Sequence, residues 1–178
     1  MQPRNSKFAY GYVARVLHWS SVALLLGVVV LGTQLADIPD EPDAPQVLSR
    51  HVSLGLLLLG VMVARFVWRL CNPNPVLSYA LHDIHKRGAI SVHWFIYAVV
   101  IFQCCLGLAQ LLADGEHLVL FEVVGVRFPA FGDVELRERL NDVHKTIANA
   151  IYVVIAVHIA GAIYHQLFGV LDVADHDA

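Results

Sequence analysis

Residues 143–158, which read VHKTIANAIYVVIAVH, decide the fold of this chain. They place His144 and His158 fourteen residues apart on an otherwise mostly apolar segment. Fourteen residues make nearly four full turns of a helix, so both imidazoles project from almost the same face. At about 1.5 Å per residue the two lie about 21 Å apart along the axis, close to opposite surfaces of a hydrocarbon core about 30 Å thick. One helix therefore presents two histidines at two depths.

The composition of the whole chain is that of a membrane protein. Of 178 residues, 57% are hydrophobic and 15% are charged, and the mean hydropathy is +0.61. Soluble domains contain about 45–50% apolar and about 25% charged residues, so this composition disfavours a soluble enzyme and a disordered protein. The formal net charge of −3 offers no basic surface to hold phosphates, which disfavours binding to nucleic acid.

Four long apolar stretches predict an all-α integral membrane four-helix bundle that forms one domain over residues 1–178. Each stretch is about 20 residues or longer, enough to cross a bilayer, and all seven prolines fall outside them. Residues 114–143 are expected to be the longest loop, with a short helix near its end and Asn141 or Asp142 as the N-cap of the fourth span. The stretches cover about residues 13–35, 51–70, 90–113 and 144–170.

The distribution of lysine and arginine predicts that both termini lie in the cytoplasm. Seven basic residues fall on the side of the termini and five on the other side, and the first loop, residues 36–50, is acidic. The seven are Arg4, Lys7, Arg15, Arg65, Arg69, Lys86 and Arg87, and the five are Arg50, Arg127, Arg137, Arg139 and Lys145.

The chain has ten histidines, although an imidazole without a partner is costly in lipid. Depth along the spans pairs four of them: His18 with His158 toward the cytoplasm, and His51 with His144 toward the outside. Each pair draws on two helices, as interior cofactor sites of helical bundles do. Haem b, with an imidazole on each face of its iron, suits such pairs, and the absence of a CxxCH motif excludes covalent attachment.

Two alternative roles for the paired histidines are hydrogen bonding between helices and proton transfer. A single imidazole in a span commonly hydrogen-bonds to a neighbouring helix, but four that pair by depth disfavour this role. A proton relay would normally include carboxylates within the spans, and the four stretches contain none, which favours electrons as the cargo.

The remaining six histidines are not expected to bind iron. His93 is expected to line a quinone or propionate pocket, and His165 is expected to lie at the membrane interface. The other four fall in predicted loops or the C-terminal tail and are expected to be solvated: His82, His85, His117 and His176.

Small and basic residues accompany the histidines. The glycines either admit a macrocycle close to the backbone or pack helices together, and the basic residues either contact haem propionates or extend to lipid headgroups. The glycines are Gly55, Gly107 and Gly161, and the basic residues are Arg15, Arg50 and Lys145.

Three motifs carry a family resemblance. They are Arg15-Val-Leu-His18-Trp19, Ser49-Arg-His51-Val-Ser-Leu-Gly55 and Val143-His144-Lys-Thr-Ile-Ala-Asn149, the last followed by His158. With them the chain resembles, over nearly its whole length, the bacterial cytochrome b561 family, within a broader group that includes the cytochrome b subunits of nickel–iron hydrogenases. The resemblance implies a multi-pass protein of the bacterial inner membrane with two non-covalent b haems. It also implies His18, His51, His144 and His158 as iron ligands.

The resemblance further implies electron exchange with the quinone pool, and the most similar-looking members are superoxide:quinone oxidoreductases, which oxidise superoxide to dioxygen and reduce ubiquinone. The outer loops hold eleven acidic and five basic residues, and such a surface suits a basic partner protein at least as well as an anion. The alternative is therefore an electron-transfer subunit that links quinone to a periplasmic dehydrogenase or cytochrome. A non-redox transporter or metal-binding protein is a third hypothesis, and a bundle of this size is compatible with a monomer or a homodimer.

Overall fold

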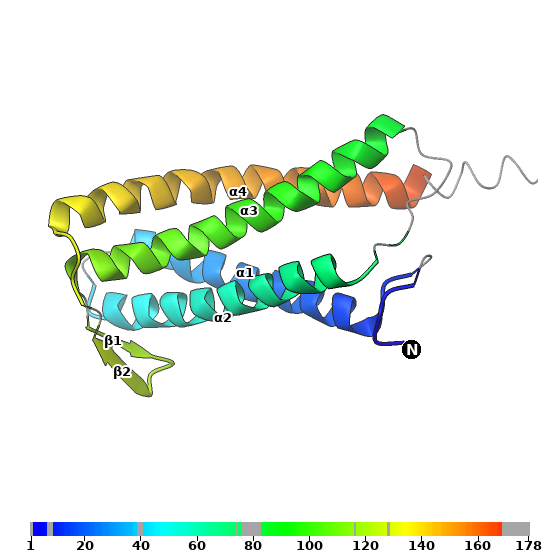
Figure 1. Cartoon of the computed structure of the whole chain (residues 1–178). Coiled ribbons are helices and arrows are strands. Elements are labelled where there is room, and N and C mark those ends of the chain that lie inside the picture. Colours follow the sequence, from blue (N-terminus) through cyan, green and yellow to red (C-terminus); the bar gives the residue numbers. More distant parts are fainter. Residues whose placement is uncertain are drawn as a thin grey trace, which may run out of the picture.

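The computed structural model describes a bundle of four long helices with one β-hairpin (Figure 1). The helices are α1 (Tyr12–Asp37), α2 (Ala44–Cys71), α3 (Asp83–Asp114) and α4 (Val134–Phe168). The hairpin, β1 (His117–Leu120) and β2 (Val124–Arg127), lies between α3 and α4. The described residues are 2–6, 9–38, 41–73, 75, 83–115, 117–127 and 129–168. The prediction of an all-α membrane bundle is confirmed.

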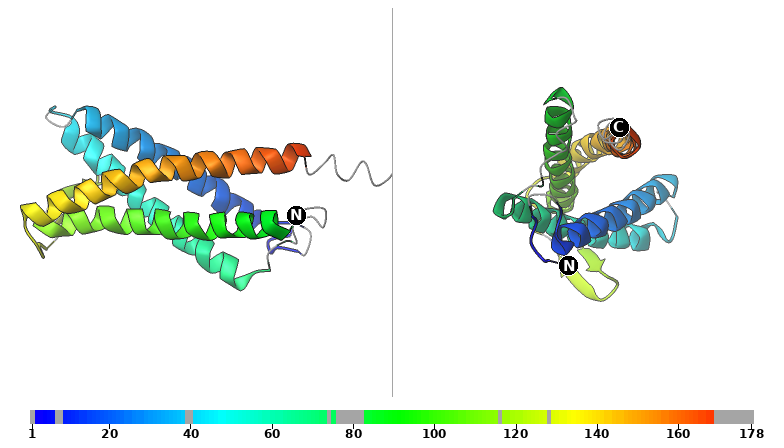
Figure 2. Two further views of the ribbon diagram at one scale, coloured as in Figure 1. Left: turned by 90° about the horizontal axis from the view of Figure 1, so that it is seen from above. Right: turned by 90° about the vertical axis from the view of Figure 1, so that its right-hand side faces the viewer.

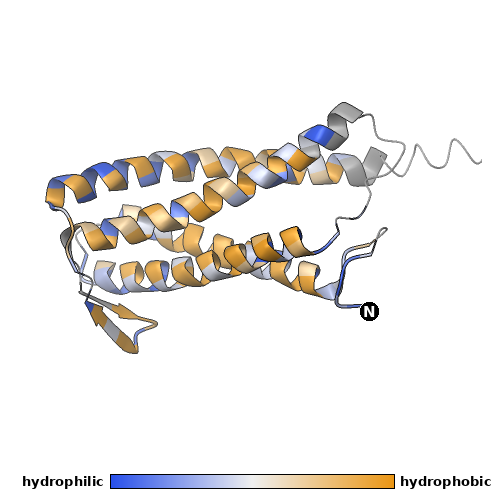
Figure 3. Ribbon diagram, viewed as in Figure 1, coloured by the Kyte–Doolittle hydropathy of each residue, from blue (hydrophilic) through white to orange (hydrophobic). Residues whose placement is uncertain are grey.

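All four helices are long and apolar enough to cross a membrane. Apolar residues run along each of them (Figure 3), and large side chains such as Trp19 and Val153, 66% and 65% exposed, face outward. Outward apolar side chains are favourable when the surrounding medium is hydrocarbon, so the chain is a multi-pass membrane protein.

The bundle consists of two helical hairpins joined along α2 and α3. Within the described ranges, α1 packs against α2 and α3 packs against α4, and of the helices in different pairs only α2 and α3 bring their backbones close together (Figure 2). The buried core at this junction contains Leu58 and Met62 of α2 with Tyr97 and Val100 of α3. The start of α1 and the end of α4 lie at one end of the bundle, here called the terminal end, and the β-hairpin lies at the other, the hairpin end (Figure 1).

Helices α2, α3 and α4 begin earlier than the apolar stretches predicted. Helix α2 begins at Ala44, with Pro45 in its first turn, where the missing N–H of proline costs no hydrogen bond. Helix α3 begins at Asp83, so His85 belongs to a helix and not to a loop. Hydrophobicity marks only the part of a helix that lies in lipid, and polar turns extend beyond it. Of the predicted fourth stretch, residues 169–170 lie outside the described residues.

The predicted N-cap of the fourth helix is wrong. Helix α4 runs without a break from Val134, so residues 135–142 are its first turns and neither Asn141 nor Asp142 is an N-cap. The cap is Asp133, whose Oδ1 accepts a hydrogen bond from the backbone N–H of Leu136 at 2.8 Å. Nothing in the polar segment that follows breaks a helix, and an ion pair between Arg139 and Glu135 supports it.

The β-hairpin replaces part of the loop predicted over residues 114–143. Its strands are antiparallel, and it lies against α2. The hydroxyl of Ser49 donates to the carbonyl of Val119. Ser53 Oγ accepts from the N–H of Phe121 at 2.8 Å and donates to the carbonyl of Ser49 at 2.7 Å. Both serines are buried, so their hydroxyls fix the hairpin to the hairpin end of α2.

Replacing Ser53 by alanine is expected to lower the free energy of unfolding by about 1–3 kcal/mol, because the partly buried N–H of Phe121 loses its acceptor. Reversible unfolding of the purified protein in mixed micelles measures the change. Thr33→Ala is the control: the Thr33 hydroxyl donates to the carbonyl of Val30 at an exposed position, and its loss should change stability by less than about 0.5 kcal/mol. Equal effects of the two substitutions would show that the hairpin contact is not stabilising.

Candidate functional site

His51 of α2 and His144 of α4 face one another toward the hairpin end of the bundle. Their ring centroids are 6.3 Å apart and the ring planes are inclined by 71°. A metal–imidazole bond is about 2 Å long, so two imidazoles that bind one metal ion from opposite sides have ring centres about 6 Å apart. The observed separation therefore fits two histidines that would hold one haem iron between them.

Helix α1 sets the orientation of the His51 ring. Nδ1 of His51 lies 3.0 Å from the carbonyl oxygen of Val28. Because a carbonyl can only accept, Nδ1 carries the proton, and Nε2 keeps the lone pair that binds a metal. One turn further along α1, a Cβ placed on Gly32 would lie 3.1 Å from His51 Cε1. The ring thus rests on a glycine and donates to a backbone carbonyl, the support that metal-binding histidines usually have.

Helix α3 supports His144 in a similar way. A Cβ placed on Gly107 would lie 3.3 Å from His144 Cε1, so Gly107 lies at the depth of this pair. Gln103, one turn earlier, donates from Nε2 to the carbonyl of His144 at 2.8 Å. Within the described structure, His144 Nδ1 and Gln103 Oε1 are buried without a hydrogen-bond partner. Such atoms are rare in folded proteins, and an orphaned imidazole nitrogen in a glycine-lined contact fits a site that binds a haem group.

Toward the terminal end, a second cluster draws one side chain from each helix. His93 of α3 and His158 of α4 have ring centroids 5.2 Å apart, with ring planes inclined by 86°. His18 of α1 lies within electrostatic range of both, and Arg65 of α2 lies within range of His18 and His158. Three imidazoles and one guanidinium, all partly buried, therefore lie in one region of the bundle.

The ring separation of His93 and His158 disfavours these two as the ligands on opposite sides of one metal ion, and the pairing of His18 with His158 stays a prediction. The 5.2 Å between the rings of His93 and His158 is less than the approximately 6 Å that two ligands on opposite sides of one metal require. Among the residues that the structure describes, no group of three or more histidine, cysteine, aspartate or glutamate side chains is arranged to hold a metal ion by itself. The donor set fits a haem with two of these imidazoles, and His93 then lies beside it.

The basic residues suggested for haem propionates differ in their surroundings. Arg50 forms an ion pair with Glu122 in the turn of the β-hairpin, so its charge is already compensated. Arg15 and Lys145 are exposed on their helices. The side chain of His165 lies outside the described residues.

Gly55 and Gly161 follow His51 and His158 by about one turn, so each shares a helix face with its histidine. A Cβ at either position would meet no other atom within 4 Å. These two glycines therefore do not pack helices together at these points.

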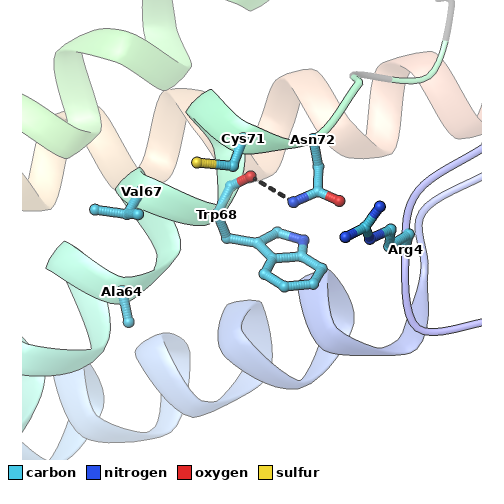
Figure 4. Close-up of a pocket in the computed structure, with 6 residues that line it drawn as sticks. All are labelled: Arg4, Ala64, Val67, Trp68, Cys71 and Asn72. Carbon is cyan, nitrogen blue, oxygen red and sulfur yellow. Dashed lines mark hydrogen bonds between the residues drawn. The ribbon is translucent and has the colours of Figure 1, made fainter.

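A separate pocket of about 540 Å³ lies at the terminal end of α2, next to the N-terminal segment (Figure 4). Asn5 Nδ2 donates to the carbonyl of Pro73 at 3.0 Å and so ties this segment to the end of α2. Asn72 Nδ2 donates to the carbonyl of Trp68 at 3.1 Å. No histidine contributes to the pocket, which is lined by Arg4, Ala64, Val67, Trp68, Cys71 and Asn72.

Sequence reasoning missed Gly32, Gln103 and Arg65. The contact between Gly32 and His51 joins two helices and leaves no signal in the spacing of residues. Gln103 and Arg65 did leave one, because each is a strongly polar side chain within an apolar span. The charge of Arg65 contributed to the predicted topology but not to the predicted site.

Comparisons with known proteins agree with the family resemblance. The sequence model described as prokaryotic cytochrome b561 matches residues 9–173. The chain is 26% identical over 150 residues to a protein of Yersinia pestis named probable superoxide oxidase CybB, covering 84% of each chain. It is 25% identical over 121 residues to cytochrome b561 homolog 2 of Escherichia coli strain K12, covering 66% of this chain and 63% of the other.

Replacing Gly32 by alanine is expected to push the His51 ring out of position and weaken haem binding about 10- to 100-fold, the usual effect of losing support behind a metal ligand. The haem-to-protein ratio of the purified protein on dilution measures this. Gly60→Ala is the matched control, because a Cβ at this exposed position of α2 meets nothing within 4 Å. If both variants retain haem equally, Gly32 has no part in the site.

Proposed function

Because the chain belongs to the prokaryotic cytochrome b561 family, we propose that it is a dihaem cytochrome b that moves electrons between the periplasmic face of the bacterial inner membrane and the quinone pool. Family membership implies membrane electron transfer and b-type haem. The observation that carries the proposal is the facing pair of His51 and His144, with ring centroids 6.3 Å apart. When bound, haem supplies reversible one-electron chemistry at its iron.

Two haem positions follow from the histidines of α4. His51 and His144 would hold a haem near the hairpin end, and His18 and His158 would hold one near the terminal end. The separation of about 21 Å along α4 supports two distinct groups. Around them, the residues of this chain orient the imidazoles, as Val28 does for His51, and apolar helices exclude water.

The charge distribution supports a cytoplasmic terminal end and a periplasmic hairpin end. The side of the termini carries seven lysine and arginine residues, among them Arg65 and Arg69, against five on the side of the hairpin. The pair formed by His51 and His144 would then be the one nearer the periplasm.

We infer that superoxide is the electron donor and ubiquinone the acceptor. Each superoxide anion gives up one electron and leaves as dioxygen, so two superoxide ions and two protons convert one ubiquinone to ubiquinol. Support comes from a relative that is named a probable superoxide oxidase, at 26% identity. In this role His51 and His144 would hold the haem that lies nearer the donor.

A second function is favoured by the ion pairs of the hairpin end. Arg50 is paired with Glu122, and Arg139 is paired with Glu135, so two of the cations that could attract an anion are compensated. An electron-transfer subunit that receives a basic periplasmic dehydrogenase or cytochrome would match such a surface.

Replacing His158 by alanine is expected to remove one of two haems, because the remaining imidazole cannot hold the iron from both sides. His144→Ala should remove the other, and His93→Ala should leave two. The pyridine haemochrome assay, normalised to protein, gives the counts. Loss of no haem from His158→Ala, or a red protein with one haem in the unaltered chain, contradicts the dihaem proposal.

Stopped-flow absorbance distinguishes the two functions by mixing oxidised protein with superoxide or with ubiquinol. Superoxide is expected to reduce the haem faster than superoxide decays spontaneously. Glu122→Gln removes the partner of Arg50 and should increase the rate of haem reduction about two- to tenfold at low ionic strength. At high salt the same variant should change this rate little, because salt screens the charge of Arg50. Glu138→Gln, with the same charge change at an exposed position, is the control and should have a smaller effect. If superoxide decays at its spontaneous rate and only ubiquinol reduces the haem, the electron-transfer subunit is the better proposal.

A further inference from the structure

Two arginines of α2 lie inside the bundle near the terminal end. Arg65 Cζ is 5.3 Å from the ring centroid of Tyr97, and Arg69 Cζ is 5.4 Å from that of Trp94 and 5.9 Å from that of Tyr97. Tyr97 is 5% exposed and belongs to the core between α2 and α3. The two guanidinium groups therefore lie over aromatic rings, and both arginine side chains are partly buried.

Among the side chains that the structure describes, the carboxylates all lie toward the hairpin end, and none pairs with these two cations. The halves of the four spans nearest the terminal end (residues 12–24, 58–71, 90–101 and 151–164) contain no aspartate or glutamate. Nε of Arg69 is buried and has no hydrogen-bond partner in the described structure. Aromatic faces attract a guanidinium, but a cation within a membrane span normally has a paired group, and its presence marks a functional site.

The depth of the two arginines relates them to the second histidine cluster. Arg65 lies six residues before the end of α2, and His18 lies six residues after the start of α1, so both are about 9 Å from the helix ends. Arg65 is also within electrostatic range of His18 and His158. Arg69 lies one turn nearer the terminal end. An anion held by both guanidinium groups would lie on the terminal side of the histidine pair.

We propose that Arg65 and Arg69 form a carboxylate-binding site for the propionate groups of the tetrapyrrole held by His18 and His158. The inference rests on the proposed function, because it requires a haem at that pair. The planar guanidinium matches a carboxylate with two parallel hydrogen bonds. This interior site differs from the surface cations, of which Arg50 is already paired with Glu122. Arg65 is then a positioning residue whose charge also favours the reduced iron.

Equilibrium redox titration of the purified, haem-loaded full chain tests this. Arg65→Gln is expected to lower the midpoint potential of one haem only, so that its reduced-to-oxidised ratio at a fixed ambient potential falls about tenfold, equivalent to about 59 mV for one electron. Arg65→Lys should lower the midpoint potential less than Arg65→Gln does, because lysine keeps the positive charge but lacks the planar group that makes two parallel hydrogen bonds. Arg87→Gln, which removes one positive charge from an exposed position near the same end, is the control and should leave both potentials unchanged.

A second measurement identifies the anion. Transfer of haem to excess apomyoglobin should be faster from Arg65→Gln than from the unaltered protein, and for one haem per chain only. The redox titrations are also repeated in nanodiscs. The decrease in midpoint potential caused by Arg65→Gln should be the same in phosphatidylcholine alone as in nanodiscs that also contain phosphatidylglycerol. A shift that requires the anionic lipid would identify a lipid phosphate as the ligand and overturn the proposal.

The outcomes separate this inference from the proposed function. Two haems in the unaltered chain, with Arg65→Gln behaving like Arg87→Gln in potential and haem transfer, would overturn the carboxylate site alone. Fewer than two haems in the unaltered chain would contradict the proposed function and, with it, the site. If Arg65→Gln does not fold, Arg65→Lys and Arg69→Gln carry the same comparison, since each leaves one guanidinium in place.

Discussion

The need to give every polar group in lipid a partner governs the interior of this bundle. Water is absent from the hydrocarbon core, so an imidazole or guanidinium there must find its partner within the protein or in a bound group. His51 meets this need with the carbonyl of Val28, and Arg65 does so only partly, with the ring of Tyr97. His144 Nδ1, which is buried without a hydrogen-bond partner in the part of the chain that the structure describes, is the group that points to a cofactor.

Helix α2 connects the pair of His51 and His144 to the β-hairpin. Ser49 and Ser53 lie two residues before and after His51, about 200° around the helix from it, and both hold the β-hairpin. On the other side of α2, His51 contacts α1 through Val28 and Gly32. If the β-hairpin moved relative to α2, it would therefore also move relative to the His51 ring. The hydrogen bonds of the two buried serines oppose such a movement.

The sequence predicted the features that depend on one helix at a time and missed those that depend on two. Apolar length predicted the four spans, and the spacing of His144 and His158 predicted the two depths, because helical periodicity is a local property. The contact of Gly32 with His51 is made between helices and has no local signature. The β-hairpin was missed because its strands have only four residues each, too short for alternation to be recognised. The start of α4 was misplaced because hydrophobicity does not mark helix turns that lie outside the membrane.

The turn of the β-hairpin shows that the charge at this end of the molecule is set by structure. Phe121 and Glu122 both have positive φ angles, 52° and 59°, a conformation that costs about 1–2 kcal/mol for each residue other than glycine. Such strain persists only where the surroundings hold it. Here Ser53 accepts the N–H of Phe121, and Arg50 pairs with Glu122. The strained turn thus places the Glu122 carboxylate beside Arg50, which lies between Ser49 and His51 in the chain. Because Ser53 holds the turn and Arg50 holds the carboxylate, α2 sets where this negative charge lies, and in the proposed function an anionic donor approaching His51 and His144 would meet an arginine that is partly neutralised.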